Sequence, residues 1–105
     1  MIVTQHLIDR IKLRTDINVD SFISEVFSKR DEIEKLDINS PNLSKHPQVK
    51  GKLRRNPTQI FWVIDWLGYY IVEGDKNLIT MFPIKKFGKI EGGVHKVKKY
   101  LHHHT

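Results

Sequence analysis

The hydrophobic periodicity of this chain changes from helical to strand-like part-way along its 105 residues. In residues 4–36 the apolar side chains recur every three or four positions, as on one face of an amphipathic helix. Residues 59–83 are instead rich in β-branched and aromatic side chains, which strands favour. Helices followed by a run of strands are typical of an α+β domain. We therefore expect a single domain, residues 1–105, in which two N-terminal helices cover one face of an antiparallel sheet.

Two helices are expected before residue 37. The first begins after Thr4, a residue type that caps helices well, and continues to about Arg14. The second is expected over residues 19–36, where seven apolar residues recur at helical spacing: Val19, Phe22, Ile23, Val26, Phe27, Ile33 and Leu36.

Residues 37–58 show no such periodicity, and Pro, Asn, Ser and Gly are frequent among them. We expect a long polar loop, and loops of this length in small domains are usually functional or mobile. The loop contains one histidine and five basic residues: His46, Lys45, Lys50, Lys52, Arg54 and Arg55.

The predicted sheet follows the loop. We expect strands over residues 59–67 and 69–72, with a bulge or turn at Gly68. A hairpin turn is expected at residues 73–77, and the returning strand at residues 78–83. A basic tail begins at residue 84.

The charge of the chain is unevenly distributed. The formal net charge is +6, but residues 1–44 have a net charge of −2 and residues 45–105 a net charge of +8. Such an asymmetry favours one face adapted to a polyanion, most often nucleic acid. The alternative is an ordinary lysine-rich, solvated surface.

Composition excludes several other classes of protein. The absence of cysteine excludes a disulfide framework, a cysteine zinc site and a thiol nucleophile. No apolar run approaches the roughly 18 to 20 residues of a membrane helix, and the first ten residues are too polar for a secretory signal. We expect a soluble, cytoplasmic protein with no membrane partner.

His6 and Arg10 are the first candidate catalytic residues, since they lie one turn apart on the first predicted helix and Arg14 continues their row. A histidine can move protons near neutral pH, and an arginine can bind a phosphate and stabilise charge that develops on it. This pair suits RNA cleavage without a metal. The alternative is that both are ordinary surface residues.

No metal or other cofactor is expected. His102, His103 and His104 are adjacent and have no carboxylate nearby, so they are more simply the end of a basic tail or a remnant of expression. Five aromatic residues lie close to the basic loop in sequence, and we expect at most one of them to stack on a base: Phe61, Trp62, Trp66, Tyr69 and Tyr70.

Several segments resemble the phage RegB endoribonuclease family and a related group of small RelE-like domains. They are residues 4–10 (TQHLIDR), followed by Arg14 and by residues 20–23 (DSFI). Residues 66–72 (WLGYYIV) and the basic segment 85–89 (KKFGK) are also similar. Only the first motif is specific, and residues 37–58 lie outside the similarity.

The resemblance implies two helices packed on a twisted antiparallel sheet, and metal-independent cleavage of single-stranded messenger RNA to a 2′,3′-cyclic phosphate. It implies that His6 is a catalytic acid or base and that Arg10 stabilises the phosphorane. The RegB family has a second functional histidine where this chain has Ser28, which cannot exchange a proton near neutral pH. Either His46 or His95 supplies that step, or catalysis is weak, or only RNA binding is kept.

Two functions follow from these observations. The first is a phage-type or toxin-like endoribonuclease of the cytoplasm, or of the host cytoplasm if phage-encoded, acting on mRNA that can be ribosome-associated. The second is a non-catalytic regulator of the same fold that binds RNA or a protein partner such as an antitoxin. The residues expected to hold RNA are Arg14, Lys45, Lys50, Lys52, Arg54, Arg55, Lys85 and Lys86.

Overall fold

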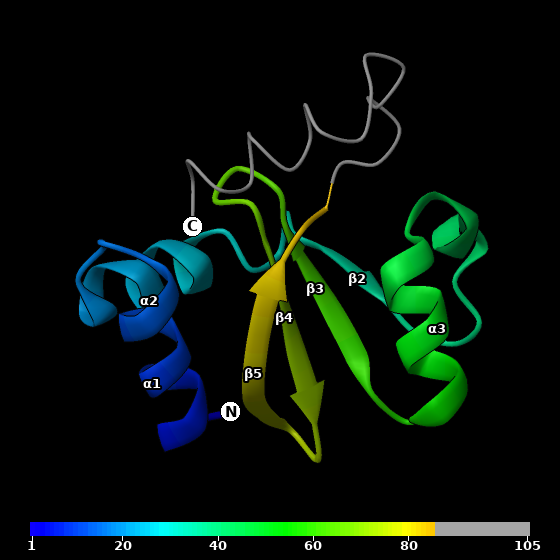
Figure 1. The fold of residues 1–105 in the computed structure, drawn as a ribbon, viewed down its shortest axis with the longest axis horizontal. Helices are drawn as coiled ribbons and strands as arrows, with labels where there is room; N and C mark the ends of the chain where they lie inside the picture. Colours follow the sequence, from blue (N-terminus) through cyan, green and yellow to red (C-terminus); the bar gives the residue numbers. More distant parts are fainter. Residues whose placement is uncertain (86–105) are drawn as a thin grey trace.

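In the computed structural model, which describes residues 1–85, helices lie on both faces of a five-stranded sheet (Figure 1). The helices are α1 (Gln5–Arg14), α2 (Val19–Ser28) and α3 (Pro47–Arg55), with a short 3-10 helix, η1 (Pro41–Lys45), before α3. The strands are β1 (Ile2–Val3), β2 (Glu34–Leu36), β3 (Ile60–Ile64), β4 (Tyr69–Gly74) and β5 (Asn77–Pro83). No helix in this part of the chain is long and apolar enough to span a membrane.

The strands are ordered β1-β5-β4-β3-β2, and the neighbours from β5 to β2 are antiparallel. β1 is parallel to β5, a pairing that the sequence did not predict. The expected fold class is confirmed, because the N-terminal helices pack on a mostly antiparallel sheet.

The two turns of the sheet depend on residues with positive φ angles. Between β4 and β5, Asp75 and Lys76 have φ angles of 51° and 64°, as in the two-residue turns that join antiparallel strands. Between β3 and β4, Gly68 has a φ of 83°. The predicted turn at Gly68 is therefore confirmed, although β3 ends at Ile64, earlier than expected.

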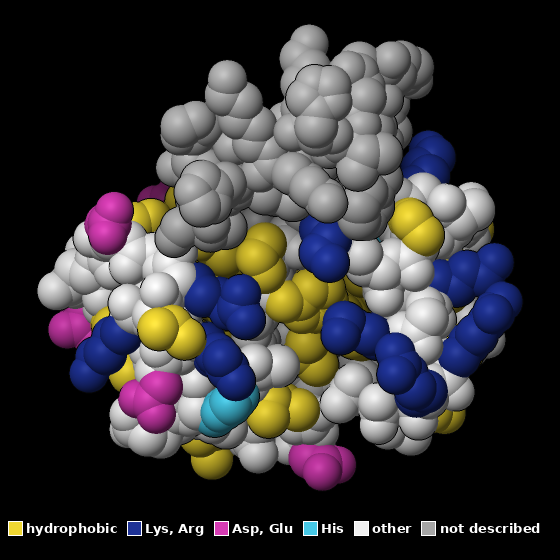
Figure 2. Space-filling view, in the orientation of Figure 1, with side chains coloured by type: hydrophobic (Ala, Val, Ile, Leu, Met, Phe, Trp, Pro, Cys, Tyr) yellow, Lys and Arg dark blue, Asp and Glu magenta, His cyan; other side chains and the backbone are white. Residues whose placement is uncertain are grey.

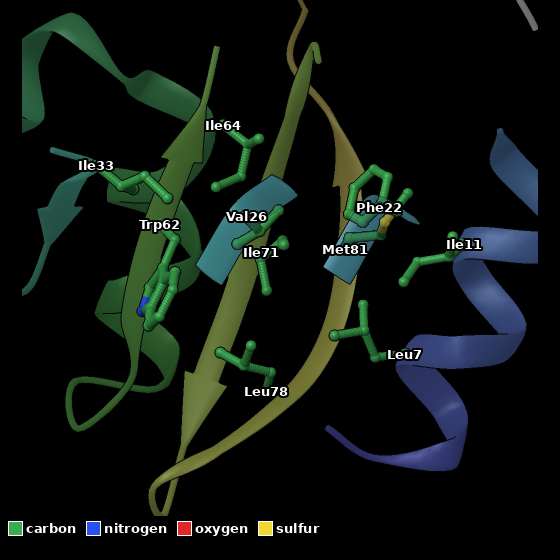
Figure 3. Packing of buried hydrophobic residues seen from close by; sticks show 10 residues of the cluster. All are labelled: Leu7, Ile11, Phe22, Val26, Ile33, Trp62, Ile64, Ile71, Leu78 and Met81. Carbon is green, nitrogen blue, oxygen red and sulfur yellow. The ribbon is translucent and has the colours of Figure 1, made fainter. Parts of the chain in front are cut away.

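α1 and α2 cover one face of the sheet and bury the first hydrophobic core (Figure 3). Leu7 and Ile11 of α1, and Phe22 and Val26 of α2, are one turn apart and point toward the sheet. The strands contribute Trp62, Ile64, Ile71, Leu78 and Met81 to this core.

α3 covers the opposite face, so the prediction of a structureless loop over residues 37–58 is wrong. Pro47 occupies the first turn of α3, where its missing N–H costs nothing. Val49 and Leu53, one turn apart, are fully buried against this face of the sheet. Their sheet partners include Phe61, Val63, Tyr70 and Val72. Two apolar residues in nine are too few to be recognised as a helical pattern.

The prediction that the second helix continues to residue 36 is also wrong, because α2 ends at Ser28. Ile33 and Leu36 have helical spacing, yet Ile33 belongs to the first core and Leu36 to the core under α3. Residues 34–36 pair with residues 61–63 of β3, and this long-range hydrogen bonding replaces the helix.

A register shift in β5 decides which of its residues face α3. Val72 pairs with Thr80 and Glu73 with Leu78, so Ile79 is the extra residue of a bulge. As a result Leu78 and Met81, three positions apart, both face the first core. Ile79 and Phe82 are partly buried against the second core instead.

Candidate functional site

Thr4 fixes the start of α1 against β5. Its backbone N–H donates to the carbonyl oxygen of Leu78 at 3.1 Å, and its hydroxyl donates to the carbonyl oxygens of Leu78 and Ile79 at 3.0 and 3.1 Å. The same hydroxyl accepts from the N–H of Leu7 at 3.3 Å, which makes Thr4 the predicted N-cap. These bonds hold the first turn of α1, which includes His6, at the edge of the sheet.

His6 is exposed and contacts Arg10, one turn further along α1. The Nε–H of Arg10 donates to Nε2 of His6 at 3.4 Å. In this arrangement Nε2 of His6 is occupied as a hydrogen-bond acceptor. The two side chains that the sequence singled out as a pair are therefore in contact.

His6 also lines a pocket of about 400 Å³ on the face of the sheet that carries α3. The pocket is formed by one residue of α1, four residues from the end of α3 and the following turn, and five residues of the sheet. They are His6; Lys52, Arg55, Asn56 and Gln59; and Phe61, Val72, Ile79, Thr80 and Phe82. Figure 2 shows hydrophobic side chains exposed between two groups of Lys and Arg side chains, with a histidine at one edge of this area.

The pocket is basic at its rim and apolar at its floor. Lys52 and Arg55 supply two positive charges, and none of the described residues that line it is acidic. The Nζ of Lys52 lies 4.7 Å from the ring centroid of Phe82. A site with cations at the rim and aromatic and aliphatic groups below suits a flat ring attached to an anionic group.

α3 is fastened to the end of β5 by Gln48. Its side-chain amide donates to the carbonyl oxygen of Pro83 at 3.2 Å and accepts from the N–H of Lys85 at 2.8 Å. Lys52 and Arg55 are therefore carried by a helix that is tied to the same strand that supplies Phe82.

His46 belongs to a different cluster from His6. Its Nδ1 is hydrogen-bonded to the hydroxyl of Tyr70 at 2.8 Å, and its Nε2 lies 3.5 Å from a carboxylate oxygen of Glu34. The amide of Asn42 donates to the other oxygen of Glu34. Burial, and secondarily Glu34, raise the pKa of Tyr70, so its hydroxyl stays protonated. His46 does not line the pocket and so does not join His6 in this structure.

The remaining predicted residues are distributed as follows. Of the cations expected to hold RNA, Lys52 and Arg55 line the pocket. Those that do not line it are Arg14, Lys45, Lys50, Arg54 and Lys85. His95 and Lys86 lie outside the described residues. α3 lies on the face of the sheet that α1 and α2 leave uncovered, and the pocket lies between α1 and the end of α3.

Ser28 is exposed at the last position of α2 and is not part of the pocket. Its hydroxyl donates to the carbonyl oxygen of Glu25 at 2.8 Å. The position at which the RegB resemblance expects a second histidine therefore does not line the pocket of His6.

Phe82, the aromatic residue beside Lys52 in the pocket, is one that the sequence did not single out. Phe61, Trp62 and Tyr70 are buried core residues, and the hydroxyl of Tyr69 donates to the carbonyl oxygen of Arg14 at 2.7 Å. Phe82 lines the pocket together with Asn56, Gln59, Ile79 and Thr80, which were also missed. The available signal was the spacing of Lys52, Arg55 and Asn56, which places all three on one side of a helix.

In residues 1–85 no group of three or more His, Asp or Glu side chains is arranged to hold a metal ion. Comparison of the chain with protein-family models, with curated proteins and with solved structures finds no match.

Proposed function

We propose that this domain binds single-stranded RNA in the pocket between α1 and α3 and cleaves it without a metal. The observation that supports the proposal is the position of His6, which contacts Arg10 and lines a pocket with Lys52 and Arg55. The pocket thus combines a proton-transferring group with cations for a phosphate. The similarity of residues 4–10 to the RegB family supports the same reaction.

The size and lining of the pocket suit one unpaired nucleotide. Its volume of about 400 Å³ lies within the range of small-molecule sites. Proteins recognise single-stranded RNA by stacking unpaired bases on aromatic side chains and by holding the backbone with cations. Phe82 and the pair Lys52 and Arg55 are available for these two tasks.

Arg10 and His6 would act in sequence. A phosphate attracts Arg10 more strongly than an imidazole nitrogen does, since hydrogen bonds from an arginine to a phosphate pair opposite charges. When the Arg10 side chain moves its hydrogen bond from His6 to the phosphate, Nε2 of His6 becomes free. This nitrogen then takes the proton of the ribose 2′-hydroxyl. The 2′-oxygen forms a bond to phosphorus, and Arg10 stabilises the developing charge. The bond from phosphorus to the 5′-oxygen breaks, and that oxygen takes a proton from solvent.

A non-catalytic RNA-binding module is the second candidate function, and one observation favours it. Among the described residues that line the pocket, His6 is the single histidine, and none is a carboxylate. Known histidine-dependent cleavage gains from both an acid and a base, and here Ser28 and His46 are outside the pocket.

Incubation of the protein with a mixed-sequence single-stranded RNA in EDTA separates the two functions. We expect products that end in a 2′,3′-cyclic phosphate, and we expect His6→Ala to lower the single-turnover rate about 10² to 10⁴-fold. RNA that is bound but left intact would favour the binding module. RNA that is neither bound nor cleaved would show that the proposal is wrong.

A further inference from the structure

Within residues 1–85, the Phe82 ring packs against two aromatic core residues and has a lysine ammonium group over it. Its ring centroid lies 5.9 Å from that of Phe61 and 5.2 Å from that of Tyr70. Tyr70 is itself fixed by its hydrogen bond to His46. The half-buried Phe82 ring is thus positioned by two side chains of the core and yet lines the pocket.

The contact between Lys52 and the Phe82 ring can be replaced by a stronger one. Lys52 is exposed and forms no ion pair within residues 1–85, and its Nζ contacts the ring of Phe82 at 4.7 Å. An exposed cation–π contact is weaker than the stacking of a nucleic-acid base on an aromatic ring. A phosphate attached to that base would also offer the ammonium group a stronger partner than the ring.

We propose that Phe82 is the platform on which one unpaired base of the RNA stacks, and that Lys52 moves from the ring to the adjacent backbone phosphate when the base enters. This inference rests on the proposed function, because it assigns the stacking residue within the same pocket.

The surroundings of Trp66 show why the same role does not fall to the most exposed aromatic residue of residues 1–85. Trp66 is 39% exposed and has Lys29 over its ring at 5.0 Å. However, Lys29 is paired with Glu25 at 2.9 Å, and the pocket beside Trp66 is lined by three carboxylates, those of Glu32, Glu34 and Asp65. These negative charges repel an RNA backbone, whereas the described lining of the Phe82 pocket has none.

The test uses a single-stranded RNA in which one base is 2-aminopurine, whose fluorescence is quenched when it stacks. We expect the wild-type protein to quench it and Phe82→Leu to abolish the quenching and to weaken binding about tenfold to a hundredfold. The matched control Trp66→Leu should behave like wild type. Lys52→Gln should keep the quenching and lower the dependence of binding on salt, because one phosphate contact is lost.

A second measurement keeps the proposal testable if Phe82→Leu fails to fold. In the wild-type protein, the ring-proton resonances of Phe82 should shift on addition of the RNA, while those of the buried Phe22 should not.

Four outcomes would overturn the proposal. Binding of RNA without quenching, or equal quenching by wild type and Phe82→Leu, would overturn the stacking role and leave the proposed function to be judged by cleavage in EDTA. Absence of RNA binding by the wild-type protein would overturn both. If polyglutamate displaces the labelled RNA as well as an unlabelled RNA of the same charge does, the pocket is a protein-docking surface instead.

Discussion

Lys50 and Lys52 lie two residues apart on α3, but only Lys52 lines the pocket that contains His6. Side chains two positions apart on a helix point in different directions, whereas those three or four apart share a side. Lys52 therefore shares its side with Arg55, and Lys50 shares another with Arg54. One short helix thus carries two cation pairs of equal charge, of which one lines the pocket.

These two pairs allow a controlled test of RNA binding. With about four phosphate contacts, the affinity of the wild-type protein should fall roughly two orders of magnitude between about 50 and about 200 mM salt. Replacing both Lys52 and Arg55 by glutamine should lower the steepness of log affinity against log salt by about 1.4. The same change at Lys50 and Arg54 should lower it less. Equal slopes for the two double variants would contradict the assignment of the pocket.

Replacement of Arg10 tests charge stabilisation. Arg10→Leu should lower the single-turnover cleavage rate about as much as His6→Ala. The reason is that the extra negative charge on the phosphate oxygens, which Arg10 stabilises, develops in the transition state. Lys12→Leu, on the same helix and exposed, is the matched control and should retain the rate. If both variants cleave at the wild-type rate, Arg10 has no part in the reaction.

Ser28→His introduces the histidine that the RegB resemblance expects. Since Ser28 does not line the pocket of His6, we expect the variant to cleave RNA at the wild-type rate. Its thermal stability should also change little, because the side chain is exposed. A clear gain of activity would mean that the reaction occurs on another surface, which includes the end of α2.

Two tyrosines predict a loss of stability in alkali. Burial raises the pKa of both Tyr69 and Tyr70 in the folded protein above the unfolded value of about 10. Their contribution to stability is therefore complete below about pH 10 and is lost as the pH rises through the folded values. Urea unfolding midpoints should fall over this range and should fall less in the Tyr69→Phe variant. Tyr70→Phe should also destabilise the protein at neutral pH, because it removes the bond to His46.

Two glycines should respond to alanine in opposite ways. Gly51 lies within α3, and a Cβ there meets no atom within 4 Å. Gly51→Ala should therefore stabilise the protein by about 0.5–1 kcal/mol. Gly68 has a φ of 83°, so Gly68→Ala should destabilise it by about 1–2 kcal/mol. Chemical unfolding measures both changes, and a shift of the same sign in both variants would contradict the backbone geometry.

The sequence alone determined the parts of the fold that depend on local patterns. The cap at Thr4, the Leu7 and Ile11 stripe and the turn at Gly68 could all be read from residue type and spacing. The contact between His6 and Arg10 was also predictable, because residues four apart on a helix are neighbours. These features need no knowledge of which segments meet in space.

The tertiary structure decided the remainder, because it depends on contacts between residues distant in the chain. Residues 34–36 became a strand because β3 offered an unpaired edge, and α3 formed because Val49 and Leu53 could be buried on the second face of the sheet. The bulge at Ile79 changes the alternation of β5 and brings Phe82 beside Lys52. A pocket formed jointly by α1, α3 and β5 has no signature in any one segment, since only folding brings the three together.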